Sequence, residues 1–401
     1  MSFNKILKQF LWLYAVLALT AFLFSSDASA KQASKPELPF AKQLQDVLDN
    51  GIKEIKGKGI SVAIIVPKYK MWISVSGVSY GTTPITPDTL FDIGSTTKNL
   101  VAALTLKLAE EGRLALDDPL HKWLPDYPNI DNTITIRQLL NHTSGISNIK
   151  GSSFIRPILK NPKKYWTPKE VITTFVRKPQ FPKGTGWHYS NTGYILLGMI
   201  IEKATRSKLS TELRNRFWNP LGLNSTFLAG EEVLPANTAH GWIDLNGDNI
   251  LEDFSIYPKT ALNSAYKGAG GVFSTSEDLV KWTHALFHEG RIVSKKSLDQ
   301  MLAFYSPIPD RPISDGFGLG VERYKSRYFN GSLFQTEKKG NPMKVWGHAG
   351  NALGYSCFIW YLPDYGVSIG LIINREQYNE FYTWLFRDFW SVIRNNLEKI
   401  R

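Results

Sequence analysis

The chain has 401 residues, enough for one large domain or two closely packed ones. Hydrophobic residues make up 43% and charged residues 20%, a balance that is typical of a folded globular protein and excludes a disordered class. The formal net charge is +12, but no basic run alternates with aromatic residues, so nucleic-acid binding is not supported. This charge would suit peripheral contact with an anionic cell envelope, but a basic, well-dispersed surface is the favoured interpretation.

The first thirty residues have the pattern of a secretory signal peptide. Lys5 and Lys8 precede an apolar run over residues 10–24, and Ala28 and Ala30 supply the small residues of a cleavage site. The run is short for a bilayer-spanning helix, although an uncleaved membrane anchor is the alternative. We therefore expect a signal peptide over residues 1–30 and a mature protein in the periplasm or outside the cell.

The segments that follow predict a helix, a hairpin and a second helix. Apolar residues recur at helical spacing over residues 40–55. Residues 60–66 and 71–76 are typical of two strands joined by a turn. Residues 91–112 then run from Gly94 into a stretch that is apolar almost all round, so this helix must be buried centrally.

Ser95 and Lys98 stand at the start of the central helix, three residues apart and therefore on one face. Free backbone N–H groups and the positive end of the helix dipole suit an anionic intermediate there. A neighbouring lysine can deprotonate a serine without histidine. The S-x-x-K pattern occurs four times, but Ser2 lies in the leader and Ser147 and Ser264 in loop-like surroundings. Ser95 is the candidate nucleophile, and a plain N-cap is the alternative.

A second apolar helix is predicted within residues 184–205, after a polar turn that carries Tyr189, Ser190 and Asn191. The Y-x-N pattern occurs twice elsewhere, and Ser190 and Asn191 could simply cap the helix. His142 lies in another polar cluster, and we expect it to brace a loop rather than to act as a catalytic base.

Residues 244–248 (DLNGD) resemble the start of a calcium-binding loop. However, Asn249 stands where that loop needs glycine, and Ser255 stands where it needs its last glutamate. A hairpin turn around Asn246 and Gly247 is the favoured interpretation, with metal binding as the alternative.

The last hundred residues predict strands and a closing helix. Residues 345–351 (VWGHAGN) indicate a strand that ends in glycine, and residues 355–362 and 367–373 indicate a second hairpin. Cys357 lies in this hairpin as the single cysteine, so no intramolecular disulfide can form. Residues 381–397 are typical of an amphipathic helix.

Strands thus gather near both ends of the chain, and helices fill its middle. We expect an α+β fold in which residues 31–90 and 261–401 build an antiparallel sheet with flanking helices. Residues 91–260 would form a helical second lobe, and the active site would lie in the cleft between the two.

Three short motifs occur in order along the chain: Ser95-Thr96-Thr97-Lys98, Tyr189-Ser190-Asn191 and His348-Ala349-Gly350. They resemble the S-x-x-K, Y-x-N and K/H-x-G elements of the serine β-lactamase and penicillin-binding protein superfamily. The tyrosine of the second motif resembles the class C β-lactamase and DD-peptidase branch. Other segments of the sequence resemble the same branch: FDIGSTTK, LALDDPL, TIRQLLNHTSGI, HYSNTGYILLGMIIE and GAGGVFSTSEDL.

The resemblance implies a β-lactamase/transpeptidase-like fold and acyl-enzyme chemistry that needs no metal or organic cofactor. Ser95 would be the acylated nucleophile, Lys98 would relay its proton, and Tyr189 would serve the leaving group as proton shuttle or base. Asn191 would bond to the substrate amide or to Lys98. The backbone N–H groups of Ser95 and Asn351 would form the oxyanion hole.

The third motif, in which His348 and Gly350 would orient the substrate, departs from class C β-lactamases. Class C β-lactamases carry lysine at the first position of this motif. This chain has His348 there, and histidine is mostly neutral at pH 7. Ala349 lacks the hydroxyl that often helps to bind a substrate carboxylate. We therefore expect weakened carboxylate recognition and slow turnover of β-lactams. Histidine at this position resembles certain DD-peptidases and D-amino-acid amidases.

The leading hypothesis is an exported, monomeric serine hydrolase of the D-Ala-D-Ala carboxypeptidase or D-amino-acid peptidase type, acting on a peptide or small-molecule substrate. A broad esterase or a class C-like β-lactamase would use the same chemistry. An inactive relative that binds wall peptide is a further alternative. The intact Ser95, Lys98 and Tyr189 speak against it, because a binding protein need not keep all three.

Overall fold

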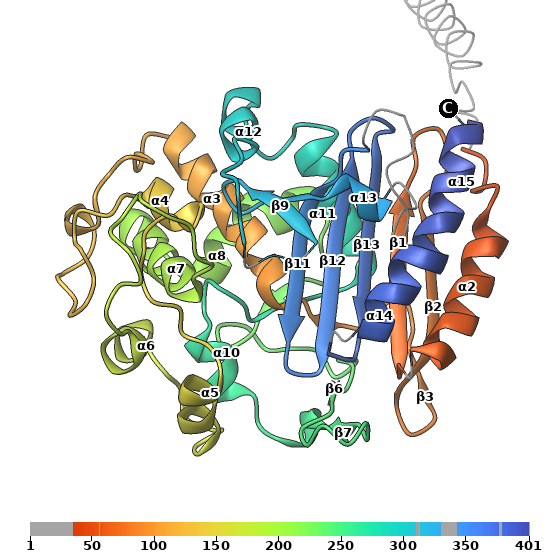
Figure 1. Cartoon of the computed structure of the whole chain (residues 1–401), viewed down its shortest axis with the longest axis horizontal. Coiled ribbons are helices and arrows are strands. Elements are labelled where there is room, and N and C mark those ends of the chain that lie inside the picture. The colour runs from red at the N-terminus through yellow and green to blue at the C-terminus, as the bar shows by residue number, and fades with distance from the viewer. Residues whose placement is uncertain are drawn as a thin grey trace, which may run out of the picture. The chain divides into compact units, whose positions relative to one another are not determined.

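The computed structural model describes residues 35–400 except 56, 310, 312, 330–342 and 377–378. The expected signal peptide, residues 1–30, lies outside this part. Residues 37–401 form one compact unit, in which a large sheet stands beside a group of helices (Figure 1). Among the residues just named as described, no helix combines the length and the apolar character needed to cross a membrane.

The sheet is built from both ends of the chain, as predicted. Strand β1 (Gly59–Ile65) pairs antiparallel with β2 (Trp72–Tyr80) on one side and with β13 (Val367–Ile373) on the other. Strand β12 (Tyr355–Leu362) follows β13, and β11 (Trp346–Ala352) follows β12. The strand order is β3-β2-β1-β13-β12-β11-β10-β9. The three short strands at its edges are β3 (Thr83–Pro84), β10 (Glu322–Tyr324) and β9 (Ser314–Phe317).

Helices cover both faces of the sheet. On one face lie α2 (Ala41–Glu54) and the carboxy-terminal helix, which share an apolar cluster with the strands (Figure 1). The carboxy-terminal helix consists of α14 (Asn379–Trp384), a π-helical turn (Leu385–Phe389) and α15 (Trp390–Ile400). On the other face lies α11 (Ser276–Phe287), where the Ser276 and Ser61 hydroxyls are 2.8 Å apart. Because both faces are covered, every residue of β12 and β13 is buried.

The helical region is organised around two buried helices, α3 (Thr97–Glu110) and α7 (Asn191–Thr205). All residues of α3 from 97 to 106 are buried, which confirms the predicted central helix. The α-helix begins two residues after Ser95, because residues 94–96 form a 3-10 turn. Shorter helices belong to the same region: α4 (Ile136–Leu140), α5 (Ser152–Leu159), α6 (Pro168–Phe175), α8 (Leu209–Leu213), α9 (Asn219–Leu221), α10 (Thr260–Ala265) and α12 (Lys295–Met301). The short helix α13 (Ser326–Phe329) lies beside the large sheet instead, where Tyr328 contacts Phe386 (Figure 1).

A second, three-stranded sheet joins the two regions and was not foreseen from the sequence. Its strands are β4 (Phe91–Asp92), β8 (Val272–Ser274) and β5 (Phe227–Leu228), with β8 in the middle. The pairing of β4 with β8 holds the glycine-rich residues 268–271 beside the loop that carries Ser95. Residues 244–248 lie between β6 (Trp242–Ile243) and β7 (Glu252–Asp253), which pair as the predicted hairpin.

Candidate active site

A cavity of about 630 Å³ lies where the helical region meets β11, and Ser95 forms part of its wall. Tyr189 and Asn191, at the start of α7, and Asn351, in β11, also line it. The fold therefore brings residues of all three sequence motifs to one cavity.

The loop before α3 is held against β11 at the backbone. Gly94 has a φ of +51°, a conformation that favours glycine, and the carboxylate of Asp92 accepts a 2.8 Å hydrogen bond from its N–H. Gly350 packs directly on the carbonyl of Ile93, where a β-carbon on Gly350 would collide with the Ile93 oxygen, so β11 has no room for a side chain at this position. These contacts place Ser95 next to Asn351, as an oxyanion hole made by the two backbone N–H groups requires.

Lys98 is fully buried, and its amine reaches Ser95. Its Nζ lies 3.0 Å from Ser95 Oγ, 2.8 Å from Asn191 Oδ1 and 2.7 Å from the carbonyl oxygen of Ala269. Burial, assisted by the nearby positive charge of Arg311, lowers the pKa of Lys98 well below its ordinary value. A neutral amine has two hydrogens for the two carbonyl oxygens and one lone pair for Ser95. Lys98 is therefore set to take the Ser95 proton.

Tyr189 faces the same centre but is not ionised. Burial raises its pKa to about 12, although the Arg311 charge and a contact with Ser95 act in the opposite direction. Its ring centroid is 4.9 Å from Lys98 Nζ and 4.1 Å from the Arg311 guanidinium carbon. A neutral tyrosine can donate its proton to a leaving group, so the geometry favours Lys98 as the base and Tyr189 as the donor.

His142 braces the Tyr189 loop, as expected. Its Nδ1 accepts a 3.2 Å hydrogen bond from the Ser190 N–H, and its ring lies 4.4 Å from that of Tyr189. Burial lowers the pKa of His142 well below its ordinary value, so the imidazole stays neutral.

His348 lies behind the cavity wall rather than in it. The wall is formed by residues 349–353, while the imidazole is fully buried and its Nδ1 donates to the Ala349 carbonyl at 2.6 Å. Burial lowers the pKa of His348 to about 4, against the opposing charge of Glu322 at 3.9 Å. The third motif thus contributes backbone to the site and no positive charge at pH 7.

The cation that lies against the Tyr189 ring is Arg311, which the motifs did not reveal. Arg311 lines the cavity, and its Nη2 is 3.3 Å from Oε1 of Glu322, whose other oxygen accepts from the Ser314 hydroxyl at 2.6 Å. Within the described residues, Arg311 Nε has no hydrogen-bond partner. Arg311 stands alone in a proline-rich loop, so no sequence pattern marks it.

The cavity is also lined by Asp92, Glu376 and Lys259. Burial raises the pKa of Asp92 to about 6 and also raises that of Glu376, which bonds to the Asn351 side chain. Lys259 donates a 2.8 Å hydrogen bond to the Tyr355 hydroxyl.

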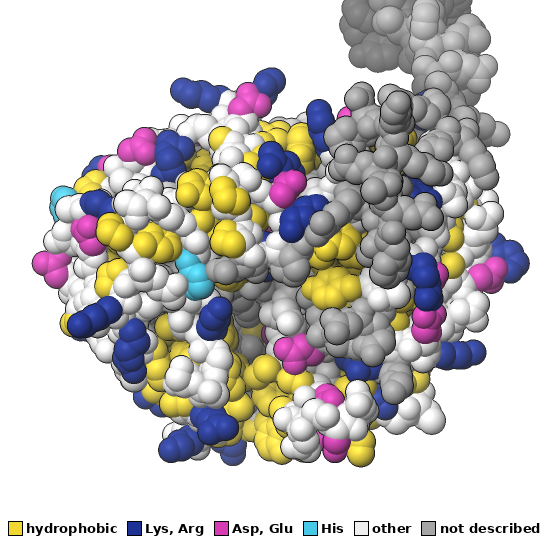
Figure 2. All heavy atoms as spheres, viewed as in Figure 1, with side chains coloured by type: hydrophobic (Ala, Val, Ile, Leu, Met, Phe, Trp, Pro, Cys, Tyr) yellow, Lys and Arg dark blue, Asp and Glu magenta, His cyan; other side chains and the backbone are white. Residues whose placement is uncertain are grey.

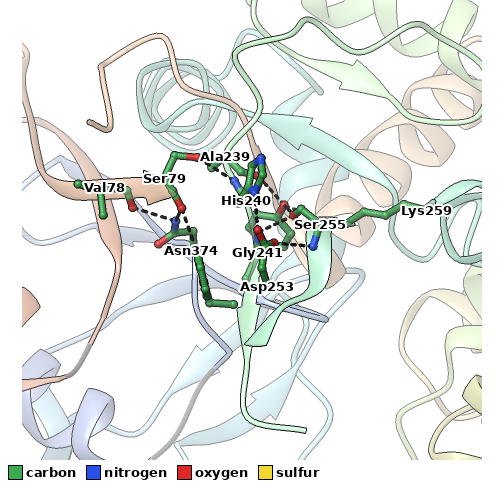
Figure 3. Close-up of polar contacts among 11 residues, drawn as sticks. Val78, Ser79, Ala239, His240, Gly241, Asp253, Ser255, Lys259 and Asn374 are labelled. Carbon is green, nitrogen blue, oxygen red and sulfur yellow. Dashed lines mark hydrogen bonds and ion pairs between the residues drawn. The ribbon is translucent and has the colours of Figure 1, made fainter. Parts of the chain in front are cut away.

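A polar network beside Lys259 ties residues 239–259 to the large sheet (Figure 3). His240 Nδ1 lies 2.6 Å from the Asp253 carboxylate, and the His240 N–H donates to the Ser79 hydroxyl at 2.9 Å. The Asn374 amide donates to the carbonyls of Val78 and Ser79. These bonds hold the segment that carries Lys259 against the large sheet.

The other S-x-x-K copies within the described residues have structural partners. Ser147 bonds to the backbone of Arg177. Lys267 is held between Glu202 and Glu231, each at 2.9 Å. Neither pair resembles the arrangement of Ser95 with Lys98.

Comparisons with known proteins show the family of the chain. The Beta-lactamase family model matches residues 44–385. Penicillin-binding protein 4 of Amycolatopsis lactamdurans is 27% identical over 323 residues, which cover 76% of this chain and 77% of that protein. The matched part corresponds to only 63% and 56% of the lengths of two Bacillus subtilis relatives, both named as penicillin-binding proteins.

Two solved structures share the fold and the order of its elements. The D-amino acid amidase from Ochrobactrum anthropi SV3, complexed with L-phenylalanine amide, is 27% identical with a TM-score of 0.74, covering 90% of this chain and 99% of that one. The D-stereospecific amidohydrolase from a Streptomyces species is 28% identical with a TM-score of 0.72, covering 88% and 99%.

Proposed function

The chain belongs to the beta-lactamase family of serine hydrolases, and we propose that it cleaves D-amino-acid peptides that end in a free carboxylate. The observation that carries this proposal is the pairing of a neutral Lys98 on Ser95 with the cation of Arg311 in the same cavity. The first group supplies acyl-enzyme chemistry, and the second supplies an anchor for a carboxylate.

In acylation, Lys98 Nζ takes the proton of Ser95 Oγ as the oxygen attacks the scissile carbonyl. The N–H groups of Ser95 and Asn351 hold the resulting oxyanion. Tyr189 gives its proton to the leaving amine and regains one from Lys98, while the Arg311 guanidinium offsets the transient negative charge on the phenol. A water molecule then repeats the sequence on the acyl-enzyme and restores free Ser95.

Arg311 supplies the charge that the third motif lacks. A charge-assisted bond to a carboxylate contributes about 1.5–3 kcal/mol, equivalent to about 10- to 150-fold in binding or rate. The Arg311 side chain is 22% exposed and Glu322 holds its Nη2, so an anionic leaving group would bind the exposed part of the guanidinium rather than the buried Nε.

The deciding experiment compares a D-Ala-D-Ala peptide with the same peptide as its carboxy-terminal amide. Nitrocefin and a short-chain aryl ester complete the panel. We expect the free acid to be cleaved with the highest kcat/KM, and Arg311→Gln to remove that preference by lowering kcat/KM for the acid about 10- to 150-fold more than for the amide or the ester. Equal rates on acid and amide in the wild type would overturn the carboxylate assignment.

A second candidate is a D-amino-acid amidase, which the similarity to the Ochrobactrum enzyme and the two carboxyls of Asp92 and Glu376 favour. These groups could accept the ammonium of a substrate with a free amino terminus. Faster cleavage of D-phenylalanine amide than of the peptide acid would select this candidate. A broad esterase or a class C-like β-lactamase would be selected by the ester or by nitrocefin.

We also propose that the enzyme works in the periplasm or outside the cell, on the basis of the leader pattern in residues 1–30. Mass spectrometry of the expressed protein should show Lys31 as its first residue. An intact Met1 on a cytoplasmic protein would contradict export.

A further inference from the structure

One stretch of the surface carries positive charge without negative charge. Residues 150–169 contain six basic residues and no acidic one. This basic ridge comprises α5 and the loop that leads to α6. Its charged members are Lys150, Arg156, Lys160, Lys163, Lys164 and Lys169.

The basic ridge begins at the catalytic cavity. Lys150, Gly151 and Ile155 line the cavity, whereas Lys160, just after the last turn of α5, does not. The ridge therefore leads from the wall near Ser95 out onto the surface. In Figure 2 the region over α5 and α6, at the lower left, displays Lys and Arg side chains and no acidic ones.

Most charges of the ridge have no acidic partner among the described residues. Phe154 and Ile158 bury the inner face of α5, while Arg156, Lys160 and Lys163 are exposed. Within the described part of the chain, Lys164 is the one member with an acidic partner, Glu170 at 3.3 Å. Like charges held together without compensation repel one another, so they favour a bound polyanion.

We propose that the basic ridge binds an acidic extension of the peptide substrate, whose scissile end lies at Ser95. This inference rests on the proposed peptidase function. The eight residues of α5 span about 12 Å, so about four extended residues of a peptide reach from the cavity to Lys160. Carboxylates along that length would meet the exposed cations in turn.

The test uses Ser95→Ala protein and two fluorescent peptides that share a D-Ala-D-Ala end. One carries three glutamates in its extension and the other three glutamines. We expect the glutamate peptide to bind about tenfold more tightly in 25 mM salt, and the difference to fall within about twofold at 300 mM, because salt screens exposed charges. Fluorescence anisotropy gives both affinities.

Arg156→Gln/Lys160→Gln/Lys163→Gln should abolish the preference for glutamate. The matched control is Arg291→Gln/Lys295→Gln/Lys296→Gln, which removes equal charge at exposed positions in and just before α12, at the other end of the molecule in Figure 1. Thermal unfolding checks that both variants fold. Equal affinity for the two peptides, or an equal loss in the control, would overturn the role of the ridge.

Failure of the proposed function looks different. In that case wild-type protein would leave both D-Ala-D-Ala peptides uncleaved, whatever their extension. A glutamate peptide without the D-Ala-D-Ala end then tests the ridge directly: salt-sensitive binding that the triple variant loses supports it, and no binding refutes it.

Discussion

The backbones of Gly94 and Asn351 are in direct contact. A β-carbon on Gly94 would lie 2.6 Å from the carbonyl oxygen of Asn351 and 2.8 Å from its amide nitrogen. The nucleophile loop and β11 are thus set at the distance that glycine allows, and this distance fixes how far apart the N–H groups of Ser95 and Asn351 lie.

Gly94→Ala should therefore damage catalysis more than stability. Alanine must push Asn351 away, and displacing one oxyanion donor typically costs about 10²–10³ in kcat. Gly112→Ala is the matched control, because Gly112 also has a positive φ, +68°, but nothing within 4 Å of the added carbon. Both variants should lose about 1–2 kcal/mol to left-handed strain. Unchanged kcat in Gly94→Ala would show that the contact between Gly94 and Asn351 does not determine the geometry of the oxyanion hole.

The acid limb of the pH–rate profile should follow Lys98. The neutral amine is the active form, so kcat/KM rises as pH passes upward through the Lys98 pKa. Arg311 lowers this pKa and Glu322 raises it, apart from the larger effect of burial. Arg311→Gln should shift the limb to higher pH and Glu322→Gln to lower pH. Profiles on a neutral aryl ester separate this effect from carboxylate binding, and shifts of the same sign would contradict it.

Covalent labelling should be confined to Ser95. A fluorophosphonate probe is expected to label wild type and Ser147→Ala alike, and Ser95→Ala not at all, because only Ser95 has a lysine amine at 3.0 Å among these serines. Lys98→Ala and Tyr189→Phe should each reduce turnover by orders of magnitude. Their combined loss should be smaller than the product of the two, since they serve one proton transfer. Retained labelling in Ser95→Ala would remove it as the nucleophile.

Lys267 predicts a stability effect rather than a catalytic one. Its partner Glu231 has a side chain only 6% exposed, against 28% for Glu202. Burial acts to raise the pKa of Glu231, but bonds from the Ser210 amide and from Lys267 prevail and hold it below the ordinary value. Glu231→Gln should lower the free energy of unfolding by about 2–3 kcal/mol at pH 7, and Glu202→Gln by about 1 kcal/mol.

The Glu231 contribution should also depend on pH in a defined direction. A carboxyl whose folded pKa lies below its unfolded value stabilises the protein above the unfolded value, near pH ~4.3, and loses that effect as pH falls through the folded pKa. The difference between wild type and Glu231→Gln in urea unfolding should shrink between pH 6 and about pH 3. A constant difference would mean that packing, not charge, carries the effect.

Local patterns predicted the fold where the elements are long and periodic. The hairpins of β1 with β2 and of β12 with β13 were foreseen because their strands are rich in β-branched and aromatic residues and flank clear turns. Strands β9 and β10 were missed because they are short and contain glycine or charged residues. Their place in the sheet depends on partners distant in sequence, which a local pattern does not contain.

The site divides in the same way. Ser95, Lys98, Tyr189 and Asn191 were foreseen from motifs and lie around one centre in the structure. Arg311 was not, because its importance comes from a fold that lays a proline-rich loop over Tyr189. The expectation of weak carboxylate recognition was based on the third motif alone and therefore did not include Arg311.

The pairing of β1 with β13 also affects when the protein can fold during its synthesis. Gly59 N–H donates to the side chain of Asn374, 315 residues away, at 2.6 Å. A growing chain that already contains Ser95, Lys98 and Tyr189 lacks Asn351 and the last strand of the sheet until most of the message has been translated. Closing such a distant contact is slow. Hydrolytic activity should therefore appear late and abruptly during synthesis, so a stalled ribosome would release a chain with its nucleophile in place and no means of using it.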